Sequence, residues 1–97
     1  MRIRFSPQAL AQAEAAQGWW KRNRRLAPHL FEDELERGLK LLHVAPLAGP
    51  PYQHRRREGV RRLLLQETRY HLYYEIGIEG LVVLAVWSAV RGRPPRL

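Results

Sequence analysis

The spacing of hydrophobic positions changes twice along this 97-residue chain. Residues 2–5 alternate between polar and apolar, which predicts a short strand with two arginines on one face and two apolar side chains on the other. Ser6 followed by Pro7 is typical of a helix start, because proline needs no hydrogen-bond donor in the first helical position. Apolar residues then recur at helical spacing, and we expect a helix over residues 7–25.

A second helix is expected directly after Pro28, because proline pushes the residue before it out of the helical conformation. Its apolar stripe consists of Phe31, Leu35, Leu39 and Leu42, and residues 44–46 end the helix. Four carboxylates between Glu32 and Glu36 would complement the positive end of the helix dipole. The short link predicts an antiparallel helical hairpin. Residues 47–59 are rich in glycine, proline and arginine and are expected to form a loop.

The last third of the chain is rich in β-branched and aromatic residues and predicts three strands, over residues 60–65, 70–76 and 81–90. The links between them are short enough for hairpins, and two prolines keep the basic tail, residues 91–97, from pairing as a strand. The sequence therefore predicts one α+β domain over residues 1–97. Its order is β-α-α-β-β-β, with a helical hairpin on one face of a mainly antiparallel sheet.

The last strand is apolar on both sides. Strict alternation places Val82, Leu84, Val86 and Val90 on one side and Leu81, Val83, Ala85 and Trp87 on the other. Two consecutive helices can cover only one face of the sheet, so the other apolar face is expected to lack cover from its own chain. Arg2 and Arg4 should share this face. We expect an amphipathic partner to bind it, and a homodimer is the alternative.

Composition narrows the class of partner. Lys and Arg total 17 against 9 Asp and Glu, a net charge of +8, and only Lys21 and Lys40 are lysines. Such a charge favours an anionic partner, and arginine pairs bidentately with phosphate or carboxylate. The chain has no cysteine and its longest apolar run is far below the ~20 residues that span a bilayer. We therefore expect a cytoplasmic protein that does not act at a membrane.

Candidate chemistry is confined to arginines and tyrosines. The four histidines are scattered without paired spacing, so no metal site and no cofactor are expected. The arginines expected to bind a target or nucleic acid are Arg55, Arg56, Arg57, Arg61, Arg62, Arg69, Arg91 and Arg93. Tyrosines lie between them in the sequence. This combination suits a single-stranded nucleic acid or an acidic protein surface equally.

The sequence resembles the RelE/ParE superfamily of toxins from bacterial type II toxin–antitoxin modules over nearly its whole length. The segments that carry the resemblance are Phe5 to Ala9, Trp19-Trp20, Ala45 to Gly49, Gly59 to Leu64, Thr68 to Glu75 and Val83 to Trp87. The resemblance implies a growth-inhibiting protein that an acidic antitoxin holds silent in a hetero-oligomer. The antitoxin would cover the apolar face of the sheet that the helices leave uncovered, at Arg2, Arg4, Val86, Trp87 and Val90.

Two activities occur in this superfamily, and the resemblance leaves both open. RelE-like members cut messenger RNA on the ribosome, and ParE-like members inhibit DNA gyrase without catalysis. By position, Arg62 and Arg91 match arginines common in the family, but Ser88 stands where close relatives often have histidine.

If the chain were a ribonuclease, the catalytic candidates would be Arg62, Arg91, Tyr73, Tyr74, His71 and Ser88, with His54 a further possible acid or base. Arginine is a poor base, so a ParE-like toxin that is not an enzyme is favoured. An endoribonuclease and a small basic nucleic-acid-binding module are the alternatives.

Overall fold

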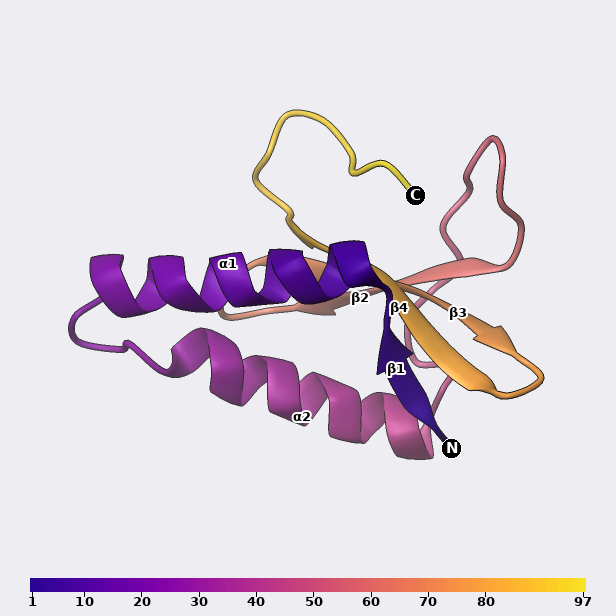
Figure 1. Cartoon of the computed structure of the whole chain (residues 1–97), viewed down its shortest axis with the longest axis horizontal. Helices are drawn as coiled ribbons and strands as arrows, with labels where there is room; N and C mark the ends of the chain where they lie inside the picture. Colours follow the sequence, from indigo (N-terminus) through magenta and orange to yellow (C-terminus); the bar gives the residue numbers. More distant parts are fainter.

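The computed structural model describes all 97 residues, and its elements follow the predicted order. They are β1 (Ile3–Phe5), α1 (Pro7–Asn23), α2 (Leu30–Val44), β2 (Val60–Leu65), β3 (Tyr70–Gly77) and β4 (Gly80–Ser88). Both helices lie along one face of a four-stranded sheet, as Figure 1 shows. The α+β prediction is confirmed. Neither helix combines the length and the apolar character that crossing a membrane requires.

Ser6 begins α1 and also fixes it to the sheet. Its hydroxyl accepts a hydrogen bond from the Ala9 amide at 3.0 Å and donates one to the Leu84 carbonyl at 3.2 Å. Its own amide donates to the Val83 carbonyl at 2.9 Å. The helix ends at Asn23, two residues before the predicted end, because Arg24 leaves the helical conformation while its amide still bonds to the Trp20 carbonyl. The N-cap thus sets the position of α1 against β4.

α2 packs closely on β2 through a glycine. A Cβ atom at Gly38 would lie 2.9 Å from a methyl group of Leu65, so a larger residue here would require the Leu65 side chain to move. Phe31 at the start of the helix packs edge-to-face on Tyr70, with 4.9 Å between the ring centroids. These contacts hold α2 over the β2–β3 pair.

The sheet has the strand order β1-β4-β3-β2, and only the β1–β4 pair is parallel. The prediction of a mainly antiparallel sheet is therefore confirmed. Gly80 has a φ of +136°, and any Cβ there would collide with the Arg2 carbonyl, so glycine is required where β1 meets β4. β4 ends at Ser88, two residues before the predicted end, because the Ala89 amide turns to bond the Arg69 carbonyl at 2.7 Å.

A bulge in β4 corrects the predicted faces of this strand. Tyr73 pairs with Ala85 and Tyr74 pairs with Val83, which leaves Leu84 as an extra residue. Every later side chain therefore changes face. Val86 lies beneath α1 with 3% exposure, so its predicted place on the open face is wrong. Val90 lies beyond the strand and is exposed.

The face opposite the helices, which we call the open face, is not bare. Four of its residues are buried: Val60, Tyr73, Leu84 and Ala85. Tyr52 of the 47–59 loop and Leu97 of the C-terminal tail pack against them, and Pro95 is buried as well. The tail, yellow in Figure 1, is held by hydrogen bonds to its backbone carbonyls from Gln8 and Trp87. The prediction that the chain leaves this face uncovered is therefore wrong in part.

Candidate functional site

A cavity of about 190 Å³ lies where β4 ends and the tail begins. We call it the arginine pocket. Its polar side chains are Arg62, His71, Tyr73, Ser88, Arg91 and Arg93. Five of the six predicted catalytic candidates are therefore brought together, from β2, β3, β4 and the tail. No carboxylate lines the cavity.

Arg62 is positioned by aromatic rings rather than by an acid. Its guanidinium carbon lies 4.9 Å from the ring centroid of Tyr52 and 5.9 Å from that of Tyr73. The two rings pack edge-to-face on each other at 5.0 Å. Arg62 forms no salt bridge, so its N–H donors remain available to an anionic ligand.

His71 lies beside Tyr73, with 5.8 Å between the two ring centroids. Burial lowers the pKa of His71 below its ordinary 6.5, and the positive charges of Arg62 and Arg69 lower it further. The imidazole is therefore neutral at pH 7. A neutral imidazole beside a guanidinium can accept a proton, which is the property a general base needs.

Arg91 stacks on the indole ring of Trp87, with its guanidinium carbon 4.0 Å from the ring centroid. The Trp87 ring is oriented by the hydrogen bond from its Nε1 to the Arg93 carbonyl at 2.9 Å. The Ser88 hydroxyl accepts a hydrogen bond from the Val90 amide at 3.3 Å. The turn after β4 thus fixes the Arg91 side chain and the backbone of Arg93.

Tyr74 lies away from the arginine pocket. Its side chain is fully buried in the helix-side core, where the phenol donates to the Pro46 carbonyl at 2.8 Å and accepts from the Gly49 amide at 2.9 Å. Burial raises the pKa of this phenol above 10.0, although the Gly49 hydrogen bond and the charge of Arg61 act in the opposite direction. These contacts make Tyr74 a structural residue that anchors the loop after α2.

The other predicted target-binding arginines also lie outside the cavity. Arg61 donates to the carbonyls of Leu47 and Gly49, which ties the loop to the sheet. Arg57 pairs with Glu75 at 3.0 Å on the open face. Arg69, with a φ of +64°, occupies the β2–β3 turn. Arg55 and Arg56 are exposed on the 47–59 loop, and the half-buried His54 accepts a hydrogen bond from the Arg56 amide at 3.3 Å.

The residues predicted for the antitoxin interface do not form one patch. Arg2 and Arg4 line a separate hollow with Glu75 and Glu79, at the end of β4 opposite Trp87. Val86 is in the core. Trp87 and Val90 instead line a larger groove beside α1.

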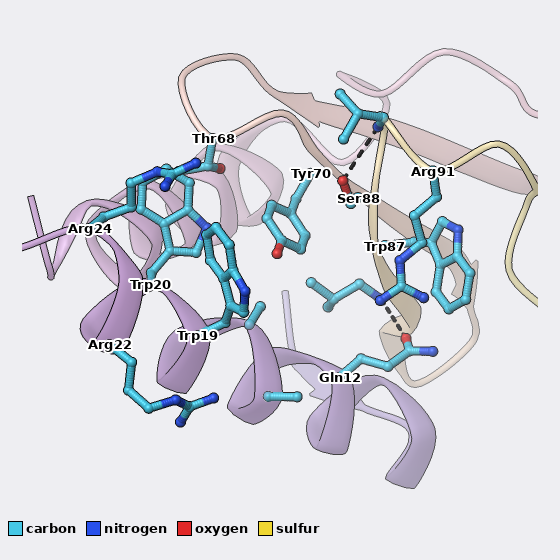
Figure 2. Close-up of a pocket in the computed structure, with 14 residues that line it drawn as sticks. Gln12, Trp19, Trp20, Arg22, Arg24, Thr68, Tyr70, Trp87, Ser88 and Arg91 are labelled. Carbon is cyan, nitrogen blue, oxygen red and sulfur yellow. Dashed lines mark hydrogen bonds between the residues drawn. The ribbon is translucent and has the colours of Figure 1, made fainter.

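This larger groove was missed by sequence reasoning. It has a volume of about 630 Å³, and its aromatic and cationic lining consists of Trp19, Trp20, Tyr70, Trp87, Arg22, Arg24 and Arg91. Figure 2 shows Tyr70 between the Trp19–Trp20–Arg24 group and the Trp87–Arg91 group. We call it the tryptophan groove. A signal was present, because adjacent residues on a helix project about 100° apart, so two neighbouring tryptophans are seldom both fully buried under one stripe.

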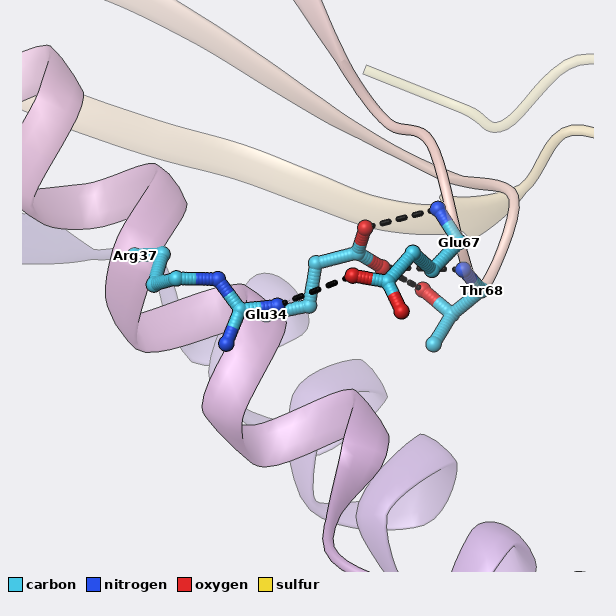
Figure 3. A network of polar contacts seen from close by, with 4 residues as sticks. All are labelled: Glu34, Arg37, Glu67 and Thr68. Atoms are coloured by element: carbon cyan, nitrogen blue, oxygen red, sulfur yellow. Dashed lines mark hydrogen bonds and ion pairs between the residues drawn. The ribbon is translucent and has the colours of Figure 1, made fainter. Parts of the chain in front are cut away.

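The turn beside this groove is held by a buried carboxylate. The Glu34 carboxylate accepts hydrogen bonds from the Glu67 amide at 2.7 Å and from the amide and hydroxyl of Thr68 at 2.9 and 2.6 Å. Figure 3 shows these bonds and the Arg37–Glu67 ion pair. Glu34 is 7% exposed, so it does more than complement the helix dipole. It fixes the turn that carries Arg69 and leads into Tyr70 of β3.

A profile described as "ParE toxin of type II toxin-antitoxin system, parDE" matches residues 3–92. No group of three or more histidines or carboxylates that could hold a metal ion is present, and no curated protein sequence matches significantly.

Solved structures share the fold. A chain of the chromosomal ParDE toxin–antitoxin system from P. aeruginosa superposes with a TM-score of 0.71 and 18% identity, covering 91% of this chain and 95% of that one. A chain of the E. coli DinJ-YafQ toxin–antitoxin complex superposes with a TM-score of 0.65 and 21% identity, covering 94% and 97%. Because the profile spans almost the entire sequence, this chain belongs to the family of ParE toxins of type II toxin–antitoxin systems.

Proposed function

We propose that this toxin inhibits DNA gyrase without catalysis, and that an acidic antitoxin bound to it in the cytoplasm keeps it silent. The observation that supports this proposal is the arginine pocket. It presents Arg62, Arg91 and Arg93 with no carboxylate among its lining residues. Guanidinium groups held on aromatic rings bind anions and acidic protein surfaces but do not exchange protons. Arg55 and Arg56, exposed on the 47–59 loop, add two more cations to the surface of the molecule.

The family match and the ParDE neighbour agree with this choice. A gyrase inhibitor should block supercoiling of a plasmid by purified gyrase. Arg62→Ala should reduce this inhibition at least about tenfold, the effect of one lost charge contact at a buried interface. Arg25→Ala removes an exposed arginine outside both cavities and serves as the matched control.

A messenger-RNA endoribonuclease is the second candidate, and one observation favours it. His71 is kept neutral inside a cavity lined by Arg62 and Arg91, so it could act as the base while the arginines stabilise charge on the phosphate.

His71→Gln separates the two activities. A ribonuclease should lose cleavage of messages on translating ribosomes by about a hundredfold or more, since general acid–base catalysis contributes that much. A gyrase inhibitor should keep most of its activity, because the variant retains every arginine of the pocket. Unchanged supercoiling together with ribosome-dependent cleavage would reject the first proposal. Harmless expression of the chain alone, without antitoxin, would reject both and leave a simple nucleic-acid-binding module.

A further inference from the structure

The first half of the 47–59 loop lies along the outer edge of β2. The Arg62 amide donates a hydrogen bond to the Pro50 carbonyl at 3.0 Å, and the Tyr52 amide donates one to the Val60 carbonyl at 2.8 Å. Two bonds of this kind run between neighbouring strands of a sheet. The loop therefore continues the sheet for a few residues and places Tyr52 in register with the strand that carries Arg62.

Side chains of the sheet hold the backbone that leads to Tyr52. One guanidinium nitrogen of Arg61 donates to the carbonyls of Leu47 and Gly49 at 3.2 and 2.8 Å. The Gly49 amide donates to the Tyr74 phenol at 2.9 Å. A Cβ atom at Gly49 would lie 2.8 Å from the Tyr74 ring, so the loop approaches the sheet as closely as glycine allows. This part of the loop has little freedom to move.

The Tyr52 ring is the nearer of the two rings beside the Arg62 guanidinium. The guanidinium carbon lies 4.9 Å from the Tyr52 centroid and 5.9 Å from that of Tyr73. Tyr73 belongs to β3, is 3% exposed and lines the arginine pocket, whereas Tyr52 is half-buried and does not line it. A change at Tyr52 therefore leaves the lining of the cavity intact and reaches it through Arg62.

An arginine side chain needs such support because it is long and has many rotamers. Ordering it at the moment of binding costs conformational entropy, which lowers the affinity for a target. Arg62 forms no ion pair that would order it beforehand. A ring held by the backbone of a fixed loop orders the guanidinium before the target arrives and leaves its N–H donors free.

We propose that Tyr52 is a positioning residue of the arginine pocket, which holds the Arg62 guanidinium in place for an acidic target surface. This step rests on the proposed function, in which Arg62 contacts the target. The 47–59 loop then belongs to the site although none of its residues lines the cavity. Its contribution is an aromatic ring rather than the exposed charges of Arg55 and Arg56.

Tyr52→Leu and Tyr52→Phe separate the ring from the rest of the side chain. Phenylalanine keeps the ring beside Arg62, and leucine keeps only an apolar body that can cover the open face. We expect Tyr52→Leu to weaken inhibition of gyrase supercoiling about two- to fivefold, the effect of one cation–π contact at a partly exposed site. Tyr52→Phe should stay within about twofold of the parent chain. Urea unfolding verifies that both variants are folded.

The pKa of His71 reports the position of Arg62 in the toxin without any target. Burial is the largest cause that lowers this pKa below 6.5, and the charge of Arg62 is the next. The charged groups around the imidazole are Arg62, Arg69, Arg91 and Arg93. When Arg62 loses its support in Tyr52→Leu, the pKa of His71 should rise toward 6.5, and in Tyr52→Phe it should not. NMR titration of the imidazole C–H signals measures both.

The same substitution in an Arg62→Gln background separates positioning from a general loosening of the open face. Glutamine has neither the charge nor the cation–π contact, so a residue that acts through Arg62 has nothing left to position. Tyr52→Leu should then change neither the pKa of His71 nor the residual inhibition. Equal effects of Tyr52→Leu in the two backgrounds would assign Tyr52 a structural role and overturn the proposal, as would a Tyr52→Leu variant identical to the parent chain.

Failure of the proposed function would give a different result. A parent chain that leaves supercoiling untouched rejects the gyrase proposal, but the titration of His71 still decides the role of Tyr52, because it is recorded on the toxin alone. A rise in the pKa of His71 in Tyr52→Leu that is absent in the Arg62→Gln background supports the positioning role in either case. The absence of such a rise in the parent background contradicts it.

Discussion

The two faces of the sheet are closed by different kinds of structure. The helix-covered face forms a buried cluster of 11 residues contributed by α1, α2 and the sheet, including Leu72, Leu81 and Val83 at 0–1% exposure. The open face buries only four, and its cover comes from Tyr52 in a loop and Leu97 at the end of the tail. Regular helices with many buried contacts separate from a sheet only at high free-energy cost, whereas irregular segments open easily.

This difference separates the residues that stabilise the fold from the residues that are available to ligands. Arg62, His71 and Tyr73 all belong to the open face, where the cover is thin and the arginine pocket lies. The helix-covered face contributes Tyr74 and Glu34, whose hydrogen bonds hold loops in place. The open face can therefore accept charged ligands without cost to the main core.

Two adjacent leucines in β2 give the largest test of this comparison. Leu65 is 3% exposed in the helix-side core, and Leu64 is half-buried on the open face, opposite His71. Leu65→Ala should lower the free energy of unfolding by about 2–5 kcal/mol, since it leaves a cavity in a packed core. Leu64→Ala should cost less than about 1.5 kcal/mol. Urea unfolding measures both, and equal losses would contradict the proposed division between the faces.

The buried carboxylate that fixes the β2–β3 turn gives a somewhat smaller effect. Glu34→Gln replaces an acceptor oxygen with an amide donor, so at least one amide or hydroxyl donor of Glu67 or Thr68 loses its partner. We expect a loss of about 1–3 kcal/mol. Glu36→Gln breaks only the exposed pair with Lys40 at 3.2 Å and should change stability by less than about 0.5 kcal/mol. Thermal unfolding compares the two variants, and matching midpoints would reject the role of Glu34.

The order of elements could be predicted from sequence because each has a local cause. Ser6-Pro7 starts α1, Pro28 separates the helices, and the change to period-2 apolar spacing marks the strands. The bulge at Leu84 could not be predicted, since it depends on how β4 pairs with β3 and changes no local pattern. That single extra residue moved Val86 from the expected interface into the core.

The candidate site was predictable only in part for the same reason. Arg62 and Arg91 were singled out, and the register of β2, β3 and the strand end brings them to one cavity. Burial of Tyr74 depends on the loop that folds over its hydroxyl, which no spacing rule reports. The tryptophan groove combines α1 with a strand edge more than 60 residues later, so only tertiary structure reveals it.

The tail offers a weaker test of the open face. Leu97 packs on the cluster of Val60, Tyr73, Leu84 and Ala85, and we expect Leu97→Ser to lower stability by about 1 kcal/mol, a partial loss of apolar burial. Arg96→Ser is the matched control, because the residue is exposed and only its backbone carbonyl bonds to Gln8. Urea unfolding gives the difference. A tail that contributes nothing would show two variants identical to the parent chain.

The smallest effect expected is a dependence on pH that originates on the open face. The native pKa of His71 lies below 6.5, so between that value and 6.5 the unfolded chain binds a proton that the native chain does not. Stability from this group is complete above pH 6.5 and falls as the pH decreases through this interval. The parent chain should therefore lose more stability between pH 7.5 and 5.5 than His71→Gln does, measured by urea unfolding at both values. His43→Gln, which removes an exposed histidine on α2, should keep the larger loss because His71 is still present.

An equal loss of stability in the parent chain and in His71→Gln would mean that the open face admits enough water to keep His71 at its ordinary pKa. The site would then lack the neutral base that the ribonuclease alternative needs.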